Sequence, residues 1–317
     1  MRTTTWLLLS GALALGACNT TPAPVDAPTA PSDAPVVLVC PTTGVPDPDM
    51  QTLPCCFRDS QADTRDAPEM RLRYIDISFP PSPSPLSGSV VGGILNTALQ
   101  EETFNWLFRT TGADADGPVE ITTGFGRRNA TTGTYHFSAG AAGTEGDPDT
   151  YLPITLAATL TGESVVADPV ITPLTVPIFD EAGTTVQIEL VLHSVQILST
   201  TLSADRSCIG ALMNSRGVFT TAATLGGYID VTEARAGVIM VSGITASLCG
   251  VVAGSITDAT YCETNPQADW MVMPDSMCDA GGVCHRDGEG GVDCDPATTC
   301  NAWYLEADFA AHGIDIE

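Results

Sequence analysis

The sequence contains no lysine, and its 12 basic residues, all arginines, face 38 acidic residues. The formal net charge of -26 argues against nucleic-acid binding, because contacts to phosphates need clusters of Lys and Arg. The absence of lysine also excludes lysine Schiff bases, the phosphate-binding GxxxxGK[ST] loop and S-x-x-K acylation sites. G-x-S-x-G and H-E-x-x-H are absent as well, so the chain lacks these two hydrolase motifs.

Charged residues are also scarce, at 16% of the chain against roughly a quarter in ordinary soluble domains. Threonine, which occurs 40 times, takes much of their place. Its β-branched side chain suits a pleated and half-solvated surface. The hydrophobic share of 44% is that of a globular protein, so the composition predicts a mainly β fold with a true core.

The N-terminus has the order of features found in exported proteins. Arg2 precedes an apolar run from Trp6 to Leu15, which has the length of a signal-peptide core and is too short to span a bilayer as an anchor. The run ends in Leu15-Gly16-Ala17-Cys18, which resembles the lipobox of bacterial lipoproteins.

The resemblance implies that residues 1–17 are a lipoprotein signal peptide and that Cys18 carries acyl chains inserted in the cell-envelope membrane. Asn19 follows the cysteine, and bacterial lipoproteins without Asp there are often sent to the outer membrane, which is the expected location. Residues 18–35, rich in Pro, Ala and Thr, can bury almost nothing and are expected to form a disordered tether. Ordinary secretion, with Cys18 coincidental, is the alternative.

Besides Cys18 the chain has ten cysteines, an even number that predicts five disulfides in an exported protein. Their pairing cannot be read from the sequence. The adjacent Cys55 and Cys56 are expected to reach separate partners, because a vicinal bridge is strained. Zinc binding is the competing use, but no C-x-x-C pair exists. The disulfide candidates are Cys40, Cys55, Cys56, Cys208, Cys249, Cys262, Cys278, Cys284, Cys294 and Cys300.

The first regular elements expected are a strand over residues 71–79 and a helix over residues 89–100. The prolines that follow the strand prevent its continuation. Ser87 or Ser89 can cap the helix. Apolar residues at helical spacing between positions 90 and 99 indicate an amphipathic helix whose stripe lies on a sheet.

Between residues 103 and 199 the apolar residues mostly alternate with polar ones, which is typical of antiparallel strands with one wet face. The clearest alternation covers residues 154–161. In residues 186–198 the phase of the alternation changes near His193, which predicts a β-bulge there. The fold class expected is an antiparallel β-sandwich or partly closed barrel, with one amphipathic helix and a disulfide-braced C-terminal loop region.

Residues 236–256 are uncharged throughout and are expected to be a buried strand or short helix, with a transmembrane span as the alternative. Asp230 and Glu233 have capping-box spacing, so a short helix can open this stretch. Residues 261–300 form a Cys-rich excursion, and a patterned last strand begins at Trp303. The chain from residue 36 to residue 317 is therefore expected to be a single β-rich domain.

One acidic loop between Cys284 and Cys294 has carboxylates interleaved with glycine, as in calcium-binding loops. It resembles EF-hand and thrombospondin-type loops but departs from the EF-hand pattern, since Val292 and Thr298 stand where Gly and Glu are required. An irregular calcium loop, to which Asp275 or Asp279 could add a ligand, competes with a plain solvated loop. Calcium is the one candidate cofactor, and the candidate ligands are Asp287, Glu289, Asp293 and Asp295.

No catalytic residues can be assigned. His193 shares a strand face with Glu189, but four residues along a strand span about 13 Å, too far for a dyad. Trp106 and Trp303 are expected in the core, and Trp270 on the surface.

Three functions remain as hypotheses. The first is a lipid-anchored envelope protein with a binding or structural role, attached to the membrane by Cys18, whose protein, glycan or lipid partner stays open. The second is a carrier of apolar ligands, in which long apolar strands and the helix enclose a cavity. The third is a hydrolase that uses dispersed carboxylates.

Overall fold

The computed structural model describes residue 56 and residues 66–80, 85–143, 146–180, 183–204, 206–213, 219–241, 244–255 and 258–317. Cys18, Cys40 and Cys55 therefore lie outside the described residues, as do the signal peptide and the tether. The chain from Val37 to Glu317 is one compact unit.

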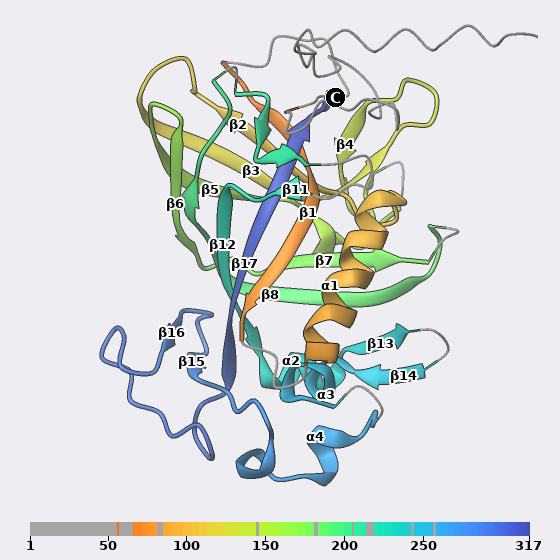
Figure 1. Ribbon diagram of the computed structural model, residues 1–317, viewed down its shortest axis with the longest axis vertical. Helices are drawn as coiled ribbons and strands as arrows, with labels where there is room; N and C mark the ends of the chain where they lie inside the picture. Colours follow the sequence, from red (N-terminus) through yellow and green to blue (C-terminus); the bar gives the residue numbers. More distant parts are fainter. Residues whose placement is uncertain are drawn as a thin grey trace, which may run out of the picture. The chain divides into compact units, whose positions relative to one another are not determined.

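The protein is mainly β, with one large antiparallel sheet and few helices, as the alternation of its sequence predicts (Figure 1). Eight strands of this sheet pair in a closed ring, because the last strand, β17, bonds to the first, β1, as well as to β12. In ring order the strands are β1 (Glu69–Phe79), β2 (Trp106–Thr111), β3 (Gly117–Arg128), β5 (Ile154–Thr161), β6 (Ser164–Val170), β8 (Val186–Thr200), β12 (Ala223–Asp230) and β17 (Ala302–Gly313).

Short strands extend the sheet outside the ring or pair with each other. Attached to the sheet are β4 (Tyr135–Phe137), β7 (Leu174–Phe179), β9 (Cys208–Ile209), β15 (Ser276–Cys278) and β16 (Cys284–Arg286). The separate two-stranded sheets are β10 (Ala211–Leu212) with β11 (Phe219–Thr220), and β13 (Val238–Val241) with β14 (Ile244–Ser247).

The alternation in β5 is reproduced residue by residue. Ile154, Leu156, Ala158 and Leu160 are buried, and the residues between them are exposed. This strand lies between β3 and β6 in the ring, so one face is covered by the interior of the ring and the other is solvated.

The bulge predicted near His193 is present in β8. Ser194 has φ +47°, and the register between β8 and β12 shifts between the pairs Tyr228–His193 and Gly226–Gln196. The extra residue reverses the phase, so Leu192 and Val195 both point into the core. β8 can thereby pair first with β7 and then with β6 and β12.

The longest helix, α1 (Pro85–Gln100), follows β1 and packs against it. Leu95, Ala98 and Leu99 are buried in the main core, so the predicted apolar face does lie on a sheet. The predicted caps are wrong, because the helix already begins at Pro85, whose fixed φ suits a first helical turn, and Ser87 and Ser89 lie inside it.

The uncharged stretch of residues 236–256 becomes a hairpin and a short helix. Asp230 caps α2 (Val231–Ala236) by accepting hydrogen bonds from the backbone N–H groups of Thr232 and Glu233, as its spacing predicts. The hairpin β13–β14 follows, and then α3 (Leu248–Ala253). None of the helices among the described residues is long and apolar enough to cross a membrane.

The Cys-rich segment, residues 258–300, contains α4 (Tyr261–Thr264), the 3₁₀ helix η2 (Gln267–Asp269) and the hairpin β15–β16. A further 3₁₀ helix, η1 (Asp149–Tyr151), precedes β5. Four disulfides are formed among the described residues: Cys56–Cys208, Cys249–Cys262, Cys278–Cys284 and Cys294–Cys300. Cys56 thus has a partner other than its neighbour Cys55, as expected.

Candidate functional site

A cavity of about 110 Å³ lies in the interior of the ring. Its walls come from six strands of the large sheet (β1, β2, β7, β8, β12 and β17), from α1, and from the β13–α3 region. All 17 lining residues that the structure describes are apolar, which is the composition expected of a site for an apolar ligand.

The sheet forms one side of the cavity. Long strand β8 contributes Ile188, Leu190 and Leu192, which its alternation before the bulge turns to the same side. β1 contributes Ile75 and Ile77, and β12 and β17 complete this wall with leucine and isoleucine side chains. A strand that alternates in this way presents every second side chain to the interior of a closed sheet.

The other side consists of α1, β13 and α3. Leu95 of α1, Ile239 of β13 and apolar side chains of α3, among them Val251 and Val252, line this side. Ile77, Leu190 and Val252 are only partly buried, so the cavity reaches solvent near these residues.

Aromatic rings form the inner end of the cavity. Trp106 lines it and stacks on Phe108 with ring centroids 6.1 Å apart, and Phe108 stacks on Phe309 at 5.5 Å. The indole N–H of Trp106 donates to Thr123 Oγ1 at 2.7 Å, and that hydroxyl donates to the Leu107 carbonyl. The indole N–H is therefore satisfied outside the cavity, and the described side chains offer an apolar surface to a ligand.

Beyond the Phe108–Phe309 stack lies a second cavity of about 20 Å³. Thr110 and Thr200 line it together with apolar side chains, and the buried Thr200 Oγ1 has no hydrogen-bond partner among the described residues. The volume suits one water molecule, for which about 10–15 Å³ is needed. This cavity is too small for an organic ligand.

The α2–α3 region that closes the cavity is held in place by polar contacts and a disulfide. His193 Nε2 and Glu233 Oε2 are 2.7 Å apart, which joins α2 to the bulge of β8. Cys249–Cys262 joins α3 to α4. The partner of His193 is therefore a residue of α2, and Glu189 instead accepts a hydrogen bond from Tyr151.

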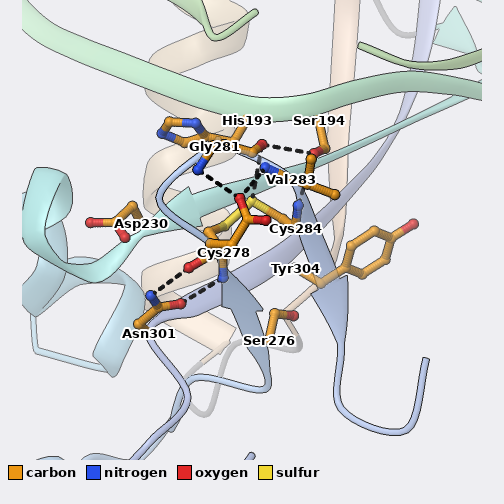
Figure 2. Close-up of a disulfide and its surroundings, with 12 residues drawn as sticks. His193, Ser194, Asp230, Ser276, Cys278, Gly281, Val283, Cys284, Asn301 and Tyr304 are labelled. Atoms are coloured by element: carbon orange, nitrogen blue, oxygen red, sulfur yellow. Dashed lines mark hydrogen bonds between the residues drawn. A yellow bond between two sulfur atoms is a disulfide. The ribbon is translucent and has the colours of Figure 1, made fainter. Parts of the chain in front are cut away.

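The His193–Glu233 pair does not form a catalytic triad with Ser194. Figure 2 shows the imidazole of His193 on the side of Asp230 and the Ser194 hydroxyl on the side of Cys284. The Ser194 hydroxyl donates to the Gly282 carbonyl at 3.3 Å and accepts from the Cys284 N–H at 3.2 Å. These bonds make Ser194 the link between β8 and the hairpin β15–β16, which Cys278–Cys284 closes.

The prediction that Trp270 lies on the surface is wrong. Its side chain is buried, stacks on Trp303 at 5.7 Å, and donates its indole N–H to the Asn265 carbonyl. Arg235 covers the ring at 5.5 Å. Trp106 and Trp303 are buried in the core, as predicted.

Three of the four candidate calcium ligands have separate contacts. Asp287 accepts the Cys294 N–H, and Asp295 caps a turn by accepting the Ala297 N–H and the Thr298 hydroxyl. Glu289 lies close enough to Tyr228 to affect its ionisation. Within the described ranges, no group of three or more His, Cys, Asp or Glu residues is arranged to hold a metal ion. The calcium site predicted at Asp287, Glu289, Asp293 and Asp295 therefore stays a prediction.

Two tyrosines beside this loop have perturbed ionisation. Burial raises the pKa of Tyr228 to about 12, with a further contribution from the negative charge of Glu289. Burial likewise raises the pKa of Tyr304 to about 12, with Glu306 adding to the effect. The two rings are 5.3 Å apart and pack against the disulfide hairpin. Both phenols therefore remain neutral at physiological pH and up to pH values well above it.

Sequence reasoning did not find the residues of the cavity, because they are spread from Ile75 to Leu305 and form no local motif. The signals present were the alternation of β8 and the uncharged stretch of residues 236–256, which indicated burial without a location. Comparison of the chain with protein-family models, curated proteins and solved structures found no match.

Proposed function

We propose that the protein is a lipid-anchored cell-envelope protein that binds an apolar ligand in the interior of its closed sheet. The observation that carries this proposal is the cavity of about 110 Å³, whose described lining residues are all apolar. The lipobox residues Leu15 to Cys18 support the anchor, and Asn19 supports the outer membrane as the location.

The size of the cavity limits the ligand. An apolar protein cavity of about 150 Å³ stays dry and binds benzene. A cavity of about 110 Å³ therefore accommodates a small ring or a short length of alkyl chain, and the rest of a longer chain lies at the partly buried residues Ile77 and Val252. A single-chain lipid or fatty acid is the class of ligand that fits this arrangement.

The hydrolase hypothesis has less support. None of the described residues that line the two cavities carries a carboxylate, and a glycosidase needs two carboxyl groups that face a substrate. A purely structural role gives no reason for an apolar space that reaches solvent, since cavities lower stability.

The test uses the mature chain from Asn19 to Glu317, exported with a signal peptide that leaves no acylated cysteine and purified without detergent. Its affinity for saturated fatty acids of increasing length is measured by titration calorimetry. Each methylene that enters the cavity contributes about 0.8 kcal/mol, or roughly a fourfold tighter Kd, until the cavity is full. An affinity that does not depend on chain length, or no binding, would refute the proposal.

A blocking variant locates the site. Val252→Trp places a large ring at the partly exposed wall of the cavity and is expected to weaken binding more than tenfold. Val166→Trp is the matched control, because Val166 lies on β6 with 46% of its surface exposed and does not line the cavity. Equal binding by both variants would place the ligand elsewhere.

A further inference from the structure

The inner face of β2 runs from the large cavity to the small one. Trp106, Phe108 and Thr110 are alternate residues of this strand and are all buried, so their side chains follow one another inside the ring. Trp106 lines the cavity of about 110 Å³, whereas Phe108 and Thr110 line the cavity of about 20 Å³. On this strand, the large cavity therefore ends at Trp106.

The pairing of β1 with β2 shows how deep Trp106 lies. Arg71 is opposite Leu107 in this antiparallel pair, so the register places Trp106 level with the next residue of β1, Leu72. β1 then continues to Ile77, which lines the cavity and is only partly buried. The five steps from Leu72 to Ile77 correspond to roughly 16 Å along the strand. Trp106 is therefore at the end of the cavity that lies away from solvent.

The indole of Trp106 is held in place by its neighbours. Its N–H donates to Thr123 Oγ1 at 2.7 Å, and its ring stacks on that of Phe108 with an angle of 10° between the planes. On the same indole packs Phe104, whose ring centroid is 6.3 Å away. Turning the indole out of this position would leave its buried N–H without an acceptor and disturb two packed rings. The inner wall of the cavity is therefore rigid.

The lining determines which end of a fatty acid enters first. None of the described lining residues carries a charge, so a carboxylate inside the cavity would have no partner among them. Burial of an unpaired charge is strongly unfavourable. The carboxylate therefore stays near the partly buried residues Ile77 and Val252, and the chain enters with its terminal methyl group first. At the inner end, this methyl group meets Trp106.

We propose that Trp106 determines the chain length that the cavity accepts, because its indole stops the terminal methyl group of a single-chain lipid. This inference rests on the proposed function, since it names the residue that sets the specificity of that site. A smaller side chain at position 106 deepens the cavity toward Phe108, whose ring lies behind the indole. The other walls of the cavity stay as they are.

Trp106→Leu is the test variant, and saturated fatty acids of increasing length are titrated by calorimetry into the mature chain from Asn19 to Glu317. In the unmodified chain, Kd is expected to fall roughly fourfold with each methylene and to become constant at one chain length. In Trp106→Leu, the fall should continue for about two more methylenes, so that the longest acids bind roughly 16-fold tighter than they bind the unmodified chain. Acids too short to reach position 106 should bind both chains with the same Kd.

Trp303→Leu is the matched control. Trp303 is also fully buried and donates its indole N–H to the Val272 carbonyl, but it is not among the described residues that line either cavity. Its chain-length limit should equal that of the unmodified chain. An unchanged limit in Trp106→Leu, or the same shift in both variants, would overturn the role of Trp106 and leave the proposed function standing.

A second measurement uses the unmodified chain and does not depend on the folding of Trp106→Leu. Fatty acids that carry bromine at a single carbon quench the fluorescence of a tryptophan that the bromine contacts. Bromine beside the terminal methyl group should quench Trp106 most strongly, and Trp106→Phe should remove this dependence on position. Quenching that is equal for all positions, or strongest near the carboxylate, would overturn the inference. If no fatty acid binds the unmodified chain, the proposed function is overturned with it.

Discussion

The closed sheet and the Cys-rich segment at residues 258–300 are held together by different means. The ring depends on pairings between distant parts of the chain, such as β1 with β17, and on a continuous apolar core. The Cys-rich segment instead has short elements, turns capped by its own carboxylates and local cross-links. Cys278–Cys284 and Cys294–Cys300 each span six positions, whereas Cys56–Cys208 spans 152.

This difference shows how one chain stabilises two kinds of backbone. Where strands can bury one face, apolar contacts are sufficient and disulfides are few. Where the sequence is rich in Gly and Asp and has little to bury, covalent links restrict the chain locally. The two regions should therefore respond differently when their cross-links or contacts are removed.

The largest effect is expected for the long-range disulfide. In the chain-entropy model the loop closed by Cys56–Cys208 contributes about 5 kcal/mol to stability, and that closed by Cys294–Cys300 about 2 kcal/mol. Cys56→Ala with Cys208→Ala should thus lower the free energy of unfolding in denaturant by more than twice as much as Cys294→Ala with Cys300→Ala. Equal losses of unfolding free energy in the two double variants would contradict the expected dependence on loop length.

A smaller effect is expected at the link between the regions. Ser194→Ala removes the hydroxyl that joins β8 to Gly282 and Cys284, and leaves the buried Cys284 N–H without its acceptor. A loss of about 1–3 kcal/mol follows, together with faster hydrogen exchange in the hairpin β15–β16. Ser199→Ala, on the exposed end of the same strand, is the control and should change stability by less than about 0.5 kcal/mol. Unaltered exchange in the hairpin after Ser194→Ala would show that the hairpin does not depend on this link.

The smallest effect concerns pH. Tyr228 and Tyr304 have pKa values raised to about 12 in the folded protein, above the ordinary value of 10.0. Their neutral forms therefore favour folding fully below pH 10, and this stabilisation is lost as the pH rises from about 10 to about 12. Phenolate absorbance should show two tyrosines that titrate late, and Glu289→Gln should let Tyr228 titrate earlier. If both tyrosines titrated with the ordinary pKa of 10.0, the burial of this cluster would be contradicted.

Local features of the fold could be predicted from the sequence, because they depend on neighbouring residues. The alternation of residues 154–161 and the bulge near His193 are both found as expected. The closure of the ring could not be predicted, since alternation indicates which face of a strand is buried but not which strand lies beside it. The cavity depends on that closure. A cavity enclosed by apolar strands and the helix was one of the hypotheses, but the residues that line it could not be named.

The individual side chains show the same limit. Trp270 was expected on the surface because it stands in a loop, yet it stacks on Trp303, which is 33 positions away. His193 was compared only with Glu189 on its own strand, whereas Glu233, 40 positions away, is its partner. The cap at Asp230 was predicted correctly because its donors are two and three residues away.

The closure of the ring has a consequence for how the protein behaves at high concentration. An unpaired strand edge can template the addition of strands from other molecules, and a ring has no such edge. Beyond Arg71, β1 is no longer paired with β2, and there the side-chain amide of Asn96 bonds to the backbone N–H and carbonyl of Ile75. Among the described strands outside the ring, β16 is three residues long and β7 contains Pro177, which cannot donate to a further strand. At high concentration, many copies should therefore remain separate and resist aggregation through their strand edges.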